Sequence, residues 1–353
     1  MQLKVILVTV VTCLQLGYSQ NCLRDEISAA FTREALANNT VYDGLLEKIN
    51  ETIHESISLA VQSELVQFLS PITKEINHLR SPGKSPCTPA HSCKEIYIKD
   101  ATSTSGYYWV KSLSAHAVQV YCDMETTSCG EDKGWVKVSS IDMSNPQHVC
   151  PSGLNTLLES GQRLCSKNID GGGCSSAHLN TNGVQYSKVC GKIIGYQKKS
   201  PDAFANYYSN RALTIDDPYV DGISLTHGQN PRHHIWTFAA ALHEIVTRAP
   251  ESLCPCTNIQ NPTQVFVPPF IGNDYFCDTA SSEQFQFQFY PYNPLWDGSG
   301  CGKLNTCCSF NNPPWFVKQL PEATTDDVEI RLCTDKGRHD EDINFEKLDI
   351  YVQ

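Results

Sequence analysis

Cysteine content is the feature that most constrains how this sequence can fold. The chain has 353 residues and 17 cysteines, of which Cys13 lies in an apolar N-terminal segment typical of a secretory signal. Sixteen cysteines remain after cleavage, an even number in an oxidising compartment, which predicts up to eight disulfides. Each would stabilise the fold by about 2–4 kcal/mol, mainly by restricting the unfolded chain.

The signal peptide is predicted over residues 1–19. Lys4 supplies its positive end, an apolar run extends from Val5 to Leu16, and small residues before Gln20 suit cleavage there. No later segment is a run of at least about 18 apolar residues, so the sequence predicts no membrane span. The mature protein is therefore expected to be soluble, secreted and extracellular.

The charge balance excludes some partners. The chain carries 27 basic and 38 acidic residues, a net charge of −11, which becomes −12 when Lys4 leaves with the signal. This argues against nucleic acid and anionic membrane surfaces as partners. It is compatible with divalent cations, mineral surfaces or basic proteins, and equally with simple solubility.

Residues 20–83 are predicted to form an amphipathic helical stalk. Apolar residues recur from Leu46 to Leu79 at roughly the 3.6-residue period of a helix, although Pro71 is expected to break or kink it. Such a stripe packs either on the globular part or on copies of itself, and we favour a homo-oligomer through 20–83. The repeat is closer to eleven residues than to seven, so a regular left-handed coiled coil is doubtful.

Several residues around the stalk carry further predictions. Cys22 and Cys87 bracket it and are candidates for interchain disulfides. Asn38 and Asn50 begin Asn-x-Thr sequons, which predicts glycosylation at both. Residues 84–92 are predicted to be a linker, because the sequence around their start (81–86) is rich in Pro, Gly and Ser.

The remainder is predicted to be α+β and mostly β, with short strands between turns. Segments 223–227 and 234–238 read as a hairpin, and segments 327–332 and 347–352 as a terminal hairpin. Two further strands are expected at Val118–Cys122 and Gly134–Ser139.

One block of this part carries a family resemblance. It runs through Cys93-Lys94-Glu95-Ile96-Tyr97, Gly106-Tyr107-Tyr108-Trp109, Tyr121-Cys122-Asp123-Met124 and Gly134-Trp135. Taken together, it resembles the opening of a fibrinogen C-terminal domain, as in fibrinogens, ficolins and intelectins. The resemblance implies a fibrinogen-like subdomain at 93–140, a Cys93–Cys122 disulfide, and an extracellular recognition role without catalysis.

The rest of the globular domain, residues 141–353, departs from that family. The calcium loop and the ligand pocket of fibrinogen C-terminal domains are missing from this sequence. No ligand-binding residue is therefore carried over from that family. Three segments in this part (Phe270–Asp278, Pro294–Cys301 and Cys307–Phe316) are similar to secreted invertebrate proteins, including cnidarian skeletal organic matrix proteins.

Two metal interpretations compete with plainer ones. Asp274, Asp278 and Asp297 offer oxygen ligands suited to calcium, but acidic residues near glycine are also ordinary turn residues. The histidines between residues 227 and 243 lack a zinc spacing and are interpreted as structural. No catalytic motif is present, so the chain is predicted not to be an enzyme.

These observations predict a secreted, non-enzymatic glycoprotein for extracellular recognition or matrix assembly. One alternative is a structural component of an acidic, skeletal organic matrix. Another is a calcium-dependent, lectin-like recognition protein. The expected partners are copies of the chain itself and extracellular glycans or matrix proteins.

Overall fold

The computed structural model describes part of the chain. The described residues are 70, 81–114, 116–159, 161–196, 214–216, 222–242, 269–280, 295–296, 315–334 and 344–353. The predicted signal peptide and nearly all of the predicted stalk therefore lie outside them. The same holds for Cys22, Asn38, Asn50 and Asp297, so the predictions for these residues stay predictions.

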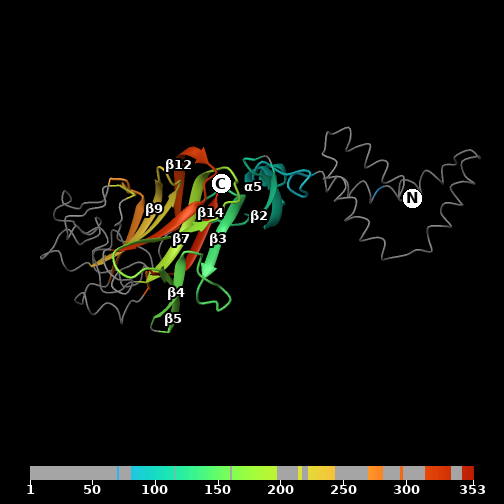
Figure 1. The fold of residues 1–353 in the computed structure, drawn as a ribbon. Coiled ribbons are helices and arrows are strands. Elements are labelled where there is room, and N and C mark those ends of the chain that lie inside the picture. The colour runs from blue at the N-terminus through green and yellow to red at the C-terminus, as the bar shows by residue number, and fades with distance from the viewer. Residues whose placement is uncertain are drawn as a thin grey trace, which may run out of the picture. The chain divides into compact units, whose positions relative to one another are not determined.

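The described residues form one helix of seven residues and a series of β-strands (Figure 1). This confirms a mostly β, disulfide-rich fold, and no helix in the described part is long and apolar enough to span a membrane. The elements are α5 (Cys93–Lys99), β1 (Gly106–Lys111), β2 (Ala117–Asp123), β3 (Trp135–Asp142), β4 (Leu154–Glu159), β5 (Gln162–Lys167), β6 (Gly173–Leu179), β7 (Tyr186–Tyr196), β8 (Gly222–His227), β9 (His233–Leu242), β10 (Tyr275–Ala280), β11 (Leu295–Trp296), β12 (Phe316–Thr324), β13 (Val328–Thr334) and β14 (Asn344–Val352).

The strands build two sheets. The larger follows the order β1-β2-β3-β14-β5-β4, and β7 joins it through β14 and pairs with β11 and β12. The smaller follows the order β10-β9-β8-β13-β6, in which only the described pairing of β10 with β9 is parallel. Strand β14 lies between β3 and β7 and is antiparallel to both (Figure 1).

One predicted hairpin is confirmed and the other is wrong. Strands β8 and β9 pair antiparallel around the turn at 228–231, as predicted. The predicted terminal hairpin does not form, because β13 lies between β6 and β8 in the small sheet while β14 belongs to the large one. Every residue of β13 is buried, which fits a central strand better than one arm of an exposed hairpin.

Aromatic side chains hold the two sheets together. The ring of Trp236 on β9 stacks on Phe316 of β12 with centroids 5.1 Å apart, and Phe238 meets the same ring edge-on at 5.7 Å. The largest fully buried side chains include Trp135, Tyr186, Tyr196, Lys167, Phe238, Phe345, Met143 and Leu164.

The chain divides into two compact units, and the described part of the smaller one contains 81–91, 108–111 and 117–119. Within it, the Ala90 amide donates to the Trp109 carbonyl at 3.0 Å, and the Lys111 amide donates to the Ala90 carbonyl at 2.8 Å. The segment predicted as a linker is thus hydrogen-bonded to β1 by its own backbone.

Disulfides tie the larger unit together. The described pairs are Cys93–Cys122, Cys129–Cys190, Cys150–Cys165 and Cys174–Cys333. Cys87 is also disulfide-bonded, so its thiol is not free. The first of these pairs joins the two cysteines that the sequence analysis singled out.

Candidate interaction surface

The surface begins at Tyr107 on β1. Successive side chains of a strand point to opposite faces, and in β1 Tyr108 and Val110 are buried while Tyr107 is 71% exposed. An aromatic ring this exposed keeps a large apolar area in water. Tyr107 is therefore a candidate contact residue rather than a core residue.

Strand β2 places a second tyrosine beside the first. Its buried residues Val120 and Cys122 flank Tyr121, which faces the other side of the strand. The rings of Tyr107 and Tyr121 meet edge to face, with centroids 5.4 Å apart and planes at 87°. This geometry places the positive edge of one ring on the negative face of the other.

A lysine on β3 continues the row to β14. The ammonium group of Lys137 lies 4.6 Å from the ring centroid of Tyr121 and 5.8 Å from that of Tyr351. Tyr351 is the register partner of Lys137, so the sheet itself brings the two side chains together. We call Tyr107, Tyr121, Lys137 and Tyr351 the tyrosine face.

The far end of the tyrosine face is more enclosed than its start. Tyr351 is only 7% exposed and packs with Trp135, Trp315 and the disulfide half Cys190. Burial raises the pKa of its phenol, and the negative charge of Asp349 raises it further. The Tyr351 phenol therefore stays neutral at physiological pH. Its buried ring is the most rigidly held part of the tyrosine face.

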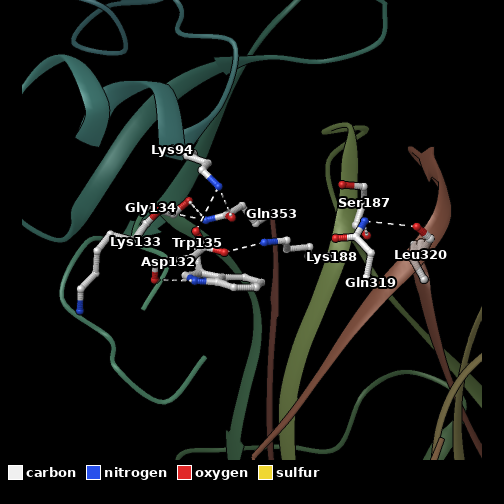
Figure 2. A network of polar contacts seen from close by, with 10 residues as sticks. All are labelled: Lys94, Asp132, Lys133, Gly134, Trp135, Ser187, Lys188, Gln319, Leu320 and Gln353. Carbon is white, nitrogen blue, oxygen red and sulfur yellow. Dashed lines mark hydrogen bonds and ion pairs between the residues drawn. The ribbon is translucent and has the colours of Figure 1, made fainter. Parts of the chain in front are cut away.

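A polar network holds the loop before β3 against α5, β7 and the residue that follows β14 (Figure 2). Asp132 accepts hydrogen bonds from Lys94 of α5 at 3.2 Å and from Lys188 of β7 at 2.5 Å. The bond from Lys188, followed by that from Lys94, holds the pKa of Asp132 below its usual value. Because the Asp132 carboxylate is 38% exposed, the pairs contribute modest stability but define where the loop before β3 lies.

The side chain of Gln353 completes the network (Figure 2). Its amide nitrogen donates to the carbonyls of Lys133 at 2.9 Å and Gly134 at 3.4 Å, while its oxygen accepts from Lys94 at 3.1 Å. The indole of the fully buried Trp135 donates to the Asp132 carbonyl at 3.0 Å. Helix α5, the loop and the start of β3 are thereby locked together.

Gly134 must be glycine for this arrangement. Its φ is +76°, and a Cβ would lie 2.6 Å from the Cys93 carbonyl oxygen and 2.7 Å from the Cα of Lys94. The backbone of β3 can approach α5 this closely only without a side chain at that position.

Only part of the predicted calcium site lies among the described residues. The Asp274 carboxylate forms an ion pair with Lys318, so a cation there would have to displace an ammonium group. Asp278 pairs through its backbone with Ala240 of β9. In the described part of the chain no group of three or more acidic, histidine or cysteine side chains could hold a metal. Calcium binding stays an untested prediction.

The histidines have structural contacts where they are described. His227 Nδ1 lies 3.0 Å from an Asp326 oxygen, and the His227 ring stacks on His233 with centroids 5.0 Å apart. His234 Nε2 is 2.8 Å from the Thr237 hydroxyl, and burial lowers the pKa of His234 to about 4. His243 lies outside the described residues.

The tyrosine face was not recognised as a site from the sequence. In the sequence, Tyr107 and Tyr121 belong to the block that resembles a fibrinogen C-terminal domain. The available signal was the alternation in Gly106–Lys111, which places Tyr107 opposite the apolar Tyr108 and Val110 side. Lys137 and Tyr351 carry no such signal, because only the pairing of β3 with β14 brings them together.

The comparisons with known proteins add a family match. Residues 61–141 match the model of the fibrillar collagen C-terminal domain, a non-enzymatic family whose domains mediate trimerisation of collagen chains. The chain is also similar to Collagen EMF1-alpha of Ephydatia muelleri, with 24% identity over 117 residues. That alignment covers 30% of this chain and 20% of the relative's length.

These findings place the protein outside the cell and correct one prediction. The protein is secreted and extracellular, and the family whose model matches residues 61–141 is non-enzymatic. The resemblance to fibrinogen C-terminal domains and skeletal matrix proteins is wrong, because the matching family model is that of the fibrillar collagen C-terminal domain. A matrix role is accordingly favoured over a recognition role.

The residues that resemble a fibrinogen C-terminal domain have local structural roles in this fold. Cys93 and Cys122 are buried as a disulfide, and Trp135 is a buried core residue. Asp123 accepts hydrogen bonds from the amides of Glu125 and Thr126 after β2. A disulfide, a strand end and a buried core place similar demands on residue type in different families.

Proposed function

We propose that this protein is a structural component of the extracellular matrix whose copies associate through the tyrosine face. The observation that carries the proposal is the exposed Tyr107 beside Tyr121, both inside the stretch that matches the fibrillar collagen C-terminal domain. Self-association is the activity that this family contributes to collagen chains.

The chemistry of the face suits contact with a protein. Tyrosine is enriched at interfaces because one side chain offers apolar area and a hydrogen-bonding tip. Burying a ring such as that of Tyr107 contributes about 1.5–3 kcal/mol, enough to change an association constant more than tenfold. Ile98 and Leu113 are also more than 70% exposed and lie within the matched stretch, so more apolar area is available there.

Two disulfides that hold the surrounding elements in place also favour association. The Cys93–Cys122 disulfide joins α5 to β2, and Cys129–Cys190 joins the loop before β3 to β7. A surface held in one conformation loses little entropy when a partner binds. The tyrosine face is thus ordered before contact.

Sedimentation equilibrium of the secreted full chain tests the proposal. We expect a mass three times that of the mature chain, and a reducing gel compared with a non-reducing gel shows whether Cys22 also links the copies. A protein that sediments as a monomer over the whole micromolar concentration range would overturn the proposal.

A further inference from the structure

The Cys174–Cys333 disulfide differs from the others in its position. The two cysteines lie directly opposite each other on the antiparallel strands β6 and β13. Their Cα atoms are 4.0 Å apart, whereas those of the other described disulfides are 5.4–5.7 Å apart. Disulfides usually join Cα atoms about 4.4–6.8 Å apart, and a bond outside that range is easier to reduce.

The two sulfur atoms differ in access. Cys333 is fully buried in β13, whereas Cys174 is partly exposed on β6, the edge strand of the small sheet. Gly171 and Gly172, which precede Cys174, are exposed. Cys174 is therefore the more accessible residue of the pair, and its sulfur is the one that a nucleophile from solvent would attack.

A buried cation faces the accessible sulfur. Arg331 is 5% exposed, its Nη2 lies 3.3 Å from Cys174 Sγ, and its Nη1 donates to the Ile215 carbonyl. Its Nε is buried without a hydrogen-bond partner. Among the described residues no carboxylate forms an ion pair with Arg331, because the neighbouring Glu329 is paired with Arg232.

We propose that Cys174–Cys333 is a thiol–disulfide exchange site for dithiol reductants, in which Arg331 stabilises the reduced form. Reduction would create a thiolate at Cys174 as the missing counter-ion of a buried guanidinium. A nearby cation lowers a thiol's pKa, and a stabilised reduced form makes the disulfide a stronger oxidant.

The exchange balances in two steps. A thiolate of the reductant attacks Cys174 Sγ and forms a mixed disulfide, while Cys333 leaves as a thiolate and takes up a proton. The second thiol of the reductant then loses its proton to solvent. The resulting thiolate attacks the reductant's other sulfur in the mixed disulfide and releases Cys174 as a thiolate beside Arg331. The dithiol is oxidised to a disulfide, and two electrons have passed to Cys174 and Cys333.

Graded reduction of the folded, secreted protein with dithiothreitol tests the order of opening. Free thiols are trapped with a maleimide and located by peptide mass spectrometry. We expect Cys174 and Cys333 to be labelled at a dithiothreitol concentration about tenfold below that needed for Cys129 and Cys190. Labelling of both pairs together, or of Cys174 and Cys333 only after the protein unfolds, would overturn the proposal.

A second measurement isolates the role of Arg331. In a Cys333→Ala variant, the pH dependence of Cys174 alkylation reports the thiol pKa, expected at least one unit below the free value of about 8.5. Adding Arg331→Met should return this pKa to the free value or above it, and Arg331→Lys should keep it low.

The matched control is Arg163→Met. Arg163 donates to the Met143, Asn145 and His148 carbonyls near another disulfide and has no described contact with sulfur. It should leave the Cys174 pKa unchanged. The role of Arg331 is contradicted if Arg331→Met leaves the Cys174 pKa unchanged. It is also contradicted if Arg163→Met changes that pKa by the same amount.

Discussion

The ammonium group of Lys137 lies between the rings of Tyr121 and Tyr351, 4.6 Å from one centroid and 5.8 Å from the other. The three side chains come from β2, β3 and β14, which are adjacent in the sheet although β14 is far from β2 and β3 in sequence. Tyr107 extends this row into solvent. The tyrosine face is therefore a product of the completed sheet.

Tyr107→Ser should weaken self-association about tenfold or more, because it removes the exposed ring without touching the core. Sedimentation equilibrium of the secreted protein measures the change. Leu158→Ser is the matched control, since Leu158 is 69% exposed on β4, which is not part of the tyrosine face. Equal weakening by both substitutions would show that general surface apolarity, not the tyrosine face, drives association.

Gly134→Ala should destabilise the fold by more than about 2 kcal/mol, because the new Cβ would meet the Cys93 carbonyl at 2.6 Å. Gly130→Ala is the control, since Gly130 has a φ of +91° but an added Cβ would meet no atom of a more distant residue within 4 Å. Urea unfolding midpoints compare the two. The prediction does not survive if both alanines cost the same.

Glu329→Gln should destabilise the folded state by about 3 kcal/mol, because it leaves Arg232 without its buried partner. Burial raises the pKa of Glu329, but bonds from Arg232, Ser176 and Thr226 outweigh it and hold the pKa below normal. The contribution is therefore full above the unfolded pKa near 4.3 and is lost as pH falls through the lower folded pKa.

Urea unfolding at a series of pH values from 7 to 3 measures this contribution. The variant should lose much of the acid-induced decline seen in the parent protein. Asp216→Asn is the comparison, since Asp216 binds the same arginine from a side chain that is 51% exposed. If Asp216→Asn lowers the free energy of unfolding as much as Glu329→Gln does, burial of the carboxylate is not what makes Glu329 important.

His234 should titrate near pH 4 in the folded protein, because burial disfavours its charged form. The unfolded chain takes up this proton near pH 6.5, so stability is full above that pH and falls as pH drops toward 4. Proton chemical shifts of the histidine ring follow the titration directly. A His234 resonance that titrates near 6.5 would contradict the prediction, and His234→Asn should remove this part of the pH dependence.

Local patterns in the sequence predicted much of the fold. The turn at 228–231 between two alternating segments identified the β8–β9 hairpin, and the cysteines indicated a disulfide-rich β domain. These features depend on residues close together in the chain or on the redox compartment. They are accessible without knowing which strands meet.

Long-range pairing could not be predicted in the same way. Alternation of apolar and polar residues predicts that β13 and β14 are strands. It does not predict that β13 pairs with β6 and β8 or that β14 pairs with β7. The tyrosine face and the contact of Arg331 with Cys174 follow from such pairings. Residue types at these positions look ordinary until the register brings them together.

The place of β14 has a consequence for how the chain is made. Residues 344–352 follow all the other described strands in sequence, yet they insert between β3 and β7. During synthesis the earlier strands emerge first and wait with an unfilled gap in the sheet. Copies of the chain consequently cannot present a finished contact surface to one another before translation has passed Tyr351, which delays their meeting until each has folded.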